Sequence, residues 1–369
     1  MNERDRRDWL RLARTENVGP VTFGALLLRY GAPGAALDAL PQLAARGGKR
    51  EFVLPPEAEI VREIETLERM GGRFILSCEA DFPAGLAALD PPPPVIAVLG
   101  HAHLLRADMV AIVGARNASA LGRRLAFTLA QELGAAGLAI ASGLARGIDS
   151  AAHEAALHTG TVAVVAGGVD IVYPPENQAL YDAIRERGAI ISEMRMGEAP
   201  QARHFPRRNR LISGLSRGLV VVEAAERSGS LITANFALEQ GREIFAVPGS
   251  PLDPRAGGCN RLLREGATLT ESAQDVLAAL APMLGHDFRE PGGAMGSAPP
   301  SSRAWEAEAD RIRAQVEEAL GPAPVGVDDI IRQVGRSHGA PAEAVLTVLL
   351  ELELAGRCAR HPGNRVSWT

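Results

Sequence analysis

The sequence predicts an α/β protein in which a parallel sheet with helices on both faces lies between a small helical domain and a second small C-terminal domain. Three observations carry this prediction. Short apolar runs alternate with helical stretches from Val110 onward, turns rich in glycine and polar residues follow the runs, and a segment rich in Gly, Pro and Ser (285–302) precedes the last helices. Repeated strand–helix units make successive strands parallel. A chain of 369 residues is long enough for such a core plus small extra domains.

The N-terminal region, assigned to residues 1–70, reads as helices. Short helices are expected from about Arg6 to Leu43 around the turn Val18-Gly19-Pro20, followed by a helix from Glu57 to Met70. The Val-Gly-Pro turn resembles helix-hairpin-helix or SAM-like units, which often accompany DNA enzymes. A plain packing domain is the alternative.

The central region, assigned to residues 71–283, supplies the strands, which read VAIV, LAIAS, TVAVVA, AIIS, LVVVEA and EIFAV. Loops that follow parallel strands meet at one edge of the sheet, where ligands bind. Four such loops are GARNASALG from Gly114, SGLARGID from Ser142, GGVDIVYPPEN from Gly167 and RSGSLITA from Arg227. Each leads into a helix whose first N–H groups can receive an anion. Ordinary turn and cap chemistry explains any one loop, but four together predict an anion-binding edge.

The segment QARHFPRRNRLISGLSRG, Gln201 to Gly218, holds five arginines and no acidic residue, although the whole chain has a net charge of −5. We expect an arginine-rich loop beside the anion-binding edge, suited to a sugar-phosphate backbone. Phe205 is placed either to stack on an unpaired base or to pack in the core.

Composition excludes several classes of protein. The three cysteines are far apart, so they form no disulfide framework and no clustered metal motif. The charged start and the lack of about 18 uninterrupted apolar residues predict a cytoplasmic protein that neither crosses a membrane nor is exported.

The sequence motifs of common enzyme classes are absent or stand in the wrong structural context, so we expect no catalytic residue, no metal and no cofactor. No phosphate-binding G-x-x-x-x-G-K-[ST] motif occurs, and the G-x-S-x-G match at Ser216 lies after a helical stretch instead of after a strand. His153 and His158 are five apart, which places their side chains on different helix faces. Asp149, His153 and Glu193 are expected to be buried polar residues.

The C-terminal region is predicted as a flexible linker, residues 284–304, and a domain over residues 305–369. Trp305 to Leu320, Val327 to Val334 and Pro341 to Leu354 read as helices, and CARHPGNRVSW reads as a hairpin. Three helices and a hairpin resemble a winged helix. Its third helix contains three glutamates and no cation, which favours a protein contact or regulatory role over duplex reading.

Three runs carry a family resemblance: SGLARGIDSAAHEAAL from Ser142, FPRRNRLISGLS from Phe205 and VVVEAAERSGSLITANFALEQGREIFAVPG from Val220. They resemble the DprA family, also called Smf, over roughly Phe74 to Leu277. The resemblance implies an extended Rossmann-like domain that binds single-stranded DNA, forms homodimers and helps to load RecA for homologous recombination, as in natural transformation.

Motif and loop positions together give the predicted DNA-binding residues, which are Arg116, Asn117, Ser119, Arg146, Arg207, Arg208, Asn209, Arg210, Ser228, Gly229 and Ser230. Two other functions stay open. One is a nucleotide phosphoribohydrolase of the LOG type, although the loop SGSLITANFA has alanine and asparagine where that enzyme places a glutamate. The other is a winged-helix regulator that binds duplex DNA.

Overall fold

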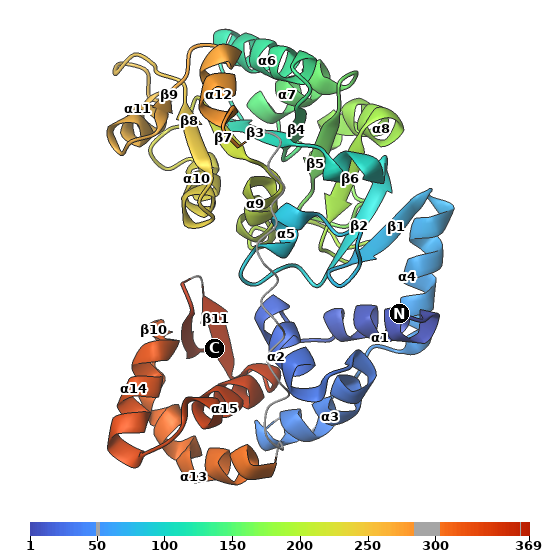
Figure 1. Cartoon of the computed structure of the whole chain (residues 1–369), viewed down its shortest axis with the longest axis vertical. Coiled ribbons are helices and arrows are strands. Elements are labelled where there is room, and N and C mark those ends of the chain that lie inside the picture. The colour runs from blue at the N-terminus through green and yellow to red at the C-terminus, as the bar shows by residue number, and fades with distance from the viewer. Residues whose placement is uncertain (49–51, 284–302, 362) are drawn as a thin grey trace. The chain divides into compact units, whose positions relative to one another are not determined.

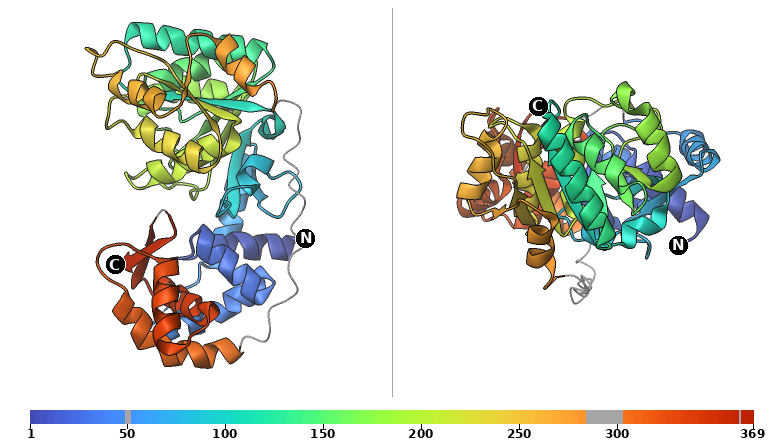
Figure 2. Two further views of the ribbon diagram at one scale, coloured as in Figure 1. Left: turned by 60° about the vertical axis from the view of Figure 1, so that its left-hand side comes forward. Right: turned by 90° about the horizontal axis from the view of Figure 1, so that it is seen from above.

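The structure is a computed structural model that describes residues 1–48, 52–283, 303–361 and 363–369. The chain divides into two compact units: residues 62–289 form one, and residues 1–61 together with 290–369 form the other. Figures 1 and 2 show a large sheet covered by helices in the first unit and mainly helices in the second. The predicted fold class is confirmed. Within the described residues no helix combines the length and the apolar character that a membrane span requires.

The large unit is built on a nine-stranded sheet with the order β1-β2-β6-β5-β4-β3-β7-β8-β9. Its strands are β1 (Gly72–Leu76), β2 (Val95–Gly100), β3 (Met109–Gly114), β4 (Ala139–Ser142), β5 (Thr161–Val164), β6 (Ala189–Ser192), β7 (Gly218–Val222), β8 (Glu243–Ala246) and β9 (Thr268–Leu269). All neighbours from β6 to β9 pair in parallel. The carboxyl ends of these seven strands therefore share one edge, as the sequence predicted.

Helices cover both faces of this sheet, because side chains along each buried strand alternate between faces. Val110 and Ile112 of β3 face one apolar cluster, whereas Ala111 and Val113 face another. The first cluster includes α6 (Ala120–Ala135), α7 (Ile148–Ala156) and α12 (Ala273–Leu280). The second includes α5 (Ala84–Ala87), α9 (His204–Leu215), α10 (Gly229–Glu239) and α11 (Gly257–Arg264). Helix α8 (Gln178–Arg187) and the short 3₁₀ helices η1 (Ala102–Arg106) and η2 (Pro175–Asn177) complete this unit.

Two features of the large unit differ from the sequence analysis. Strands β1 and β2 were not predicted, and they extend the sheet as an antiparallel pair, with β2 also antiparallel to β6. The arginine-rich part of the segment was predicted as a loop ahead of a helical stretch, and this was wrong, because helix α9 already begins at His204 and includes Arg207, Arg208 and Arg210. The reason is that Leu211, Ile212 and Leu215 supply an apolar face, which packs in the second cluster.

The small unit joins helices from both ends of the chain. Its N-terminal part contains α1 (Glu3–Ala13), α2 (Pro20–Tyr30) and α3 (Pro33–Arg46), while α4 (Glu57–Arg69) runs across the division between the units. Its C-terminal part contains α13 (Arg303–Ala319), β10 (Val325–Gly326), α14 (Val327–His338), α15 (Ala342–Leu354), β11 (Cys358–His361) and β12 (Arg365–Trp368). The predicted three helices and hairpin are therefore present. The predicted linker lies almost entirely outside the described residues, and α13 already begins at Arg303.

Candidate nucleic-acid interface

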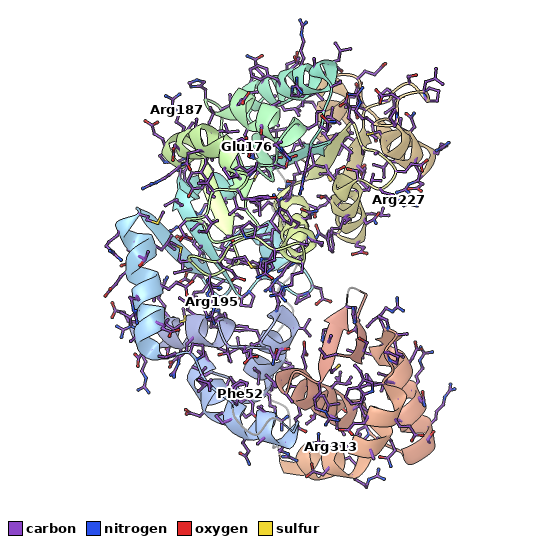
Figure 3. All side chains as sticks on the ribbon, turned by 180° about the vertical axis from the view of Figure 1, so that it is seen from behind. Phe52, Glu176, Arg187, Arg195, Arg227 and Arg313 are labelled. Atoms are coloured by element: carbon purple, nitrogen blue, oxygen red, sulfur yellow. The ribbon has the colours of Figure 1, made fainter. Side chains whose placement is uncertain are left out.

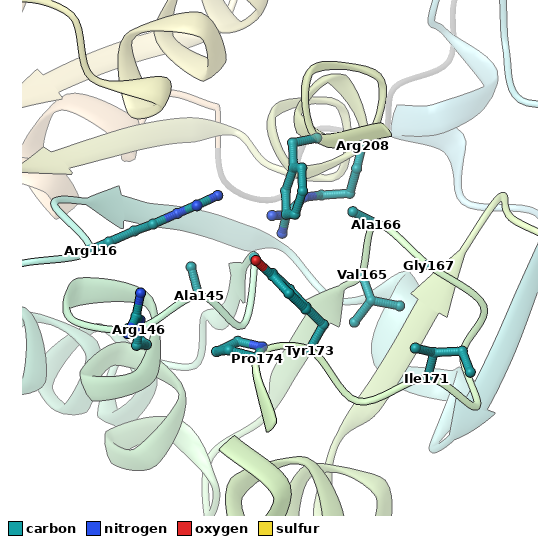
Figure 4. Close-up of a pocket in the computed structure, with 12 residues that line it drawn as sticks. Arg116, Ala145, Arg146, Val165, Ala166, Gly167, Ile171, Tyr173, Pro174 and Arg208 are labelled. Carbon is teal, nitrogen blue, oxygen red and sulfur yellow. The ribbon is translucent and has the colours of Figure 1, made fainter. Parts of the chain in front are cut away.

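A pocket opens where the loops after β3, β4 and β5 approach the start of α9, and we call it the Phe205 pocket. Its polar and aromatic side chains come from all four segments (Figure 4), where Arg116, Tyr173 and Arg208 point toward one another. The lining residues are Arg116, Gly143, Ala145, Arg146, Val165, Ala166, Gly167, Ile171, Tyr173, Pro174, Phe205 and Arg208. The parallel sheet thus brings together loops that lie far apart in the sequence.

Phe205 is half-buried and borders this pocket between cations and a second aromatic ring. The guanidinium carbon of Arg116 lies 5.1 Å from the centre of the Phe205 ring, and that of Arg208 lies 5.9 Å from it. The rings of Tyr173 and Phe205 are 5.7 Å apart at an interplanar angle of 57°. Aromatic rings and arginines at such distances make a site for a planar, electron-rich or anionic ligand.

Buried polar groups hold the guanidinium group of Arg208 in place. Its Nη1 donates to the carbonyl oxygen of Val164 over 2.6 Å, and burial lowers its pKa to about 10, which leaves it charged at neutral pH. Asp149 is also buried, and it accepts hydrogen bonds from the N–H groups of Gly143 and Ala145. Burial raises the pKa of Asp149, and the positive charge of Arg208 opposes that shift. A Cβ on Gly143 would lie 2.0 Å from Arg208 Nη1, so only glycine leaves this space for the guanidinium.

One donor atom of Arg208 is left without a hydrogen bond in the described part of the chain. Its Nε has no hydrogen-bond partner among the described residues, although only 6% of the residue is exposed. A buried donor without an acceptor is costly, and a ligand oxygen would relieve that cost. The arrangement therefore fits a ligand that brings acceptor oxygens or nitrogens into the pocket.

His153, on helix α7, has a structural role in the core of the large unit. It is fully buried, its Nδ1 lies 2.7 Å from Oγ1 of Thr161, and burial lowers its pKa to about 3. The predicted burial of Asp149, His153 and Glu193 is confirmed. Among the described residues no cluster of His, Cys, Asp and Glu could hold a metal ion.

The remaining arginines of α9 differ from one another in their environment. The carboxylate of Glu193, almost completely buried, forms an ion pair with Nη2 of Arg210 and lies 3.7 Å from Nε of Arg207. Arg210 also donates to the carbonyl of Pro91 and is 14% exposed, whereas Arg207 is 44% exposed. Arg207 is thus the more accessible of the two arginines, and Arg210 mainly joins α9 to the end of β6.

Arg146 is the third predicted cation that lines the pocket. It is exposed and lies 3.5 Å from Glu176, which Figure 3 labels, and both side chains are about 60% exposed. Such an exposed pair is weak and is easily exchanged for a phosphate contact.

Ser119 does not face the Phe205 pocket. It caps α6 by accepting a hydrogen bond from Gly122, while its own N–H and hydroxyl donate to the carboxylate of Glu223 at the end of β7. A Cβ on Gly122 would lie 2.5 Å from the carboxyl carbon of Glu223. The N-terminus of α6, where this kind of fold usually receives a phosphate, is therefore filled by the protein's own carboxylate.

The other predicted residues serve the helices. Ser228 caps α10 by accepting a hydrogen bond from the N–H of Ser230, which is buried, and Asn209 donates to the carbonyl of Gly229 over 3.4 Å. None of these, nor Asn117, lines the Phe205 pocket. Ser216 is buried at the end of α9 and donates to the carbonyl of Ile212, so the G-x-S-x-G match has the helix-before-strand order that the sequence predicted.

The sequence analysis did not identify Tyr173 or Ile171 as site residues. Both lie in the loop GGVDIVYPPEN, which was predicted to border the site but was considered only for its glycines and polar residues. An aromatic residue in a loop after a strand, beside a segment rich in arginine, is the signal that could have identified Tyr173.

Comparison with known proteins covers all three parts of the chain. The family of DNA recombination-mediator protein A matches residues 73–281, a DprA-like N-terminal helix-hairpin-helix domain matches residues 3–66, and a DprA winged-helix domain matches residues 298–364. Protein Smf of Escherichia coli is 36% identical over 320 residues, which cover 86% of this chain and 83% of that protein.

Two solved structures are similar as well. That of DNA processing protein A from Streptococcus pneumoniae has a TM-score of 0.61 at 35% identity and covers 73% of this chain and 95% of its own. That of DNA processing protein A from Helicobacter pylori, described for its single-stranded DNA binding mode, has a TM-score of 0.53 at 29% identity and covers 57% of this chain and 96% of its own. The chain belongs to the family of DNA recombination-mediator protein A, which includes DprA and Smf.

Proposed function

We propose that this protein binds single-stranded DNA by seating an unpaired base in the Phe205 pocket, with neighbouring phosphates on Arg116, Arg146 and Arg207. The observation that carries the proposal is the Phe205 ring, bordered by two guanidinium groups and by Tyr173. A base within a duplex is paired and stacked, so its faces cannot reach such a pocket, whereas an unpaired base can enter it. The single-stranded DNA binding mode described for the Helicobacter pylori relative supports single-stranded DNA as the ligand.

The residues of the pocket have different roles in this proposal. Arg208, charged and rigidly held, donates to acceptor atoms of the base, and the aromatic rings supply stacking surface. The exposed arginines neutralise phosphates without reading sequence. Binding should therefore tolerate most sequences and weaken with salt.

We further propose that the protein acts as a homodimer and helps to load RecA onto the bound strand for homologous recombination, as in natural transformation. Membership of the recombination-mediator family supports this role. A mediator needs a strand held by its backbone and by a few bases, so that other bases stay accessible to the recombinase.

The direct test compares binding of single-stranded and duplex oligonucleotides of equal length, with RecA present and absent. We expect a clear preference for the single strand and an increased rate of RecA assembly on it. Phe205→Leu should weaken single-strand binding by roughly 5- to 150-fold, because stacking of one base contributes about 1–3 kcal/mol. Phe127→Leu on α6, a residue that is 39% exposed and outside the pocket, is the matched control. Equal affinities for the two DNA forms, or no effect of Phe205→Leu, would refute the proposed site.

A further inference from the structure

Helix α15 of the winged-helix domain is buried on two sides. Val345, Val348, Leu349 and Leu352 face the core of their own domain. Leu350, Glu351 and Leu354 are also buried but lie outside that cluster, and α15 contacts α3 of the N-terminal domain within the same compact unit (Figure 1). In helix-turn-helix proteins the helix at this position enters the major groove of DNA with an exposed face. Here the C-terminal half of the helix is covered by another part of the chain, whereas Glu343 and Leu346 near its start are exposed.

Charged groups fix this contact. Glu351 has no exposed surface, and its carboxylate pairs with Arg46 at the end of α3 over 3.4 Å and with Arg313 of α13, which Figure 3 labels. Arg46 also binds Asp310 of α13 over 2.9 Å, and that partnership lowers the pKa of Asp310. A buried carboxylate requires such partners, and one of the two that Glu351 has comes from the N-terminal domain.

The N-terminal domain also lies close to the backbone of α15. The side-chain amide of Asn17 donates to the carbonyl of Leu354 over 3.2 Å. A Cβ on Gly47, directly after α3, would lie 2.0 Å from the carbonyl oxygen of Glu351 and 2.9 Å from Cβ of Ala355. The backbone of Gly47 has φ −71°, a value that any residue adopts, so glycine is required here only for the close approach.

We propose that the C-terminal winged helix is a clasp: the C-terminal half of α15 docks on the protein's own N-terminal helical domain through Arg46, Gly47 and Glu351. The clasp closes the two ends of the chain into one unit, and the docked domain keeps α15 from entering a major groove of duplex DNA. Glu351, one of the three glutamates that make α15 a poor match for phosphates, thus finds a partner in an arginine of α3.

The test uses the full chain with a protease recognition sequence in place of residues 291–297, cut after purification and analysed by gel filtration at micromolar concentration. We expect the C-terminal fragment to elute together with the rest of the chain. Gly47→Ala should separate the fragments, because the new methyl group collides with the backbone of α15. Gly24→Ala in α2, where a Cβ meets nothing within 4 Å, is the matched control and should leave the fragments together.

A second variant distinguishes loss of the docking contact from a local folding defect at Gly47. Arg46→Met keeps the length of the side chain, removes one partner of Glu351 and should weaken fragment association by at least about tenfold, whereas Arg4→Met on an exposed part of α1 should not. Single-strand binding should persist in all variants, because the Phe205 pocket lies in the other unit. Fragments that separate without any substitution, or that stay together in both Gly47→Ala and Arg46→Met, would overturn the clasp.

Discussion

Replacing Arg116 and Arg210 separately by glutamine should separate a DNA contact from a structural ion pair, although the sequence predicts the same role for both. Arg116 is exposed beside Phe205, so its loss should flatten the slope of log affinity against log salt by roughly 0.7 for single-stranded DNA. Its effect on the free energy of unfolding should stay within about 0.5 kcal/mol, as is usual for an exposed side chain.

Arg210→Gln should instead destabilise the protein. Removing one partner of a buried ion pair costs about 3–5 kcal/mol, and Glu193 keeps Arg207 within 3.7 Å, so we expect the lower limit of about 3 kcal/mol. In a domain of this size that loss lowers the melting temperature by roughly 6–12 °C. Calorimetry and fluorescence anisotropy at several salt concentrations measure the two effects, with Arg336→Gln on α14 as the control. A stable Arg210→Gln variant with a flattened salt slope would show that Arg210 contacts DNA and that the structural reading is wrong.

Three further outcomes are expected. Truncation after Ala281 should leave single-strand affinity within a few-fold of the intact chain, because the Phe205 pocket lies before that point. Loss of most of the affinity would show that the DNA-binding site has been assigned to the wrong part of the chain. Incubation with nucleoside monophosphates should release no free base, since the loop from Ser228 holds no carboxylate at the position LOG-type enzymes use; base release that depends on Ser230 or Thr233 would favour the enzyme. His153 has a folded pKa of about 3, below its unfolded value near 6.5, so its stabilising contribution is present above pH 6.5 and is lost as the pH falls. Between pH 6 and pH 4 that loss is on the order of 2–3 kcal/mol, and His153→Leu should show a smaller fall in melting temperature over this range than the unaltered protein.

The order of strands and helices in the large unit could be predicted because each element carries its own signal. The apolar runs from β3 to β8 are local in sequence, and the parallel arrangement follows from the helices between them. Strands β1 and β2 escaped prediction because they pair antiparallel, Ile75 with Ile96 and Val98 with Ile191, and so lie outside the repeated parallel βα pattern on which the prediction rested. The arginine-rich start of helix α9 was taken for a loop because its apolar face is formed mainly by residues that follow the arginines, Leu211, Ile212 and Leu215.

The roles of individual arginines could not be predicted, because their partners come from other elements. Arg207, Arg208 and Arg210 are neighbours in one motif, yet one is exposed, one is buried above Asp149 and one is paired with Glu193. Sequence spacing gives their positions around α9 but not the carboxylates that the sheet brings beside them. The docking of the winged helix on the N-terminal domain could not be predicted for the same reason, because Arg46 and Glu351 lie near opposite ends of the chain.

The occupied N-terminus of α6 explains why ligand recognition would move to the Phe205 pocket. In most folds of this kind a phosphate binds at the helix after the first strand of the parallel series, on backbone N–H groups. Here Glu223 already accepts the N–H and hydroxyl of Ser119, so a phosphate would have to displace a carboxylate and meet its negative charge. In the proposed site the phosphates are bound instead by arginine side chains on the neighbouring loops and on α9, which reach several positions along a strand. A fixed helix terminus suits one phosphate of a small nucleotide, whereas movable arginines around an aromatic pocket suit a polymer whose phosphates vary in position.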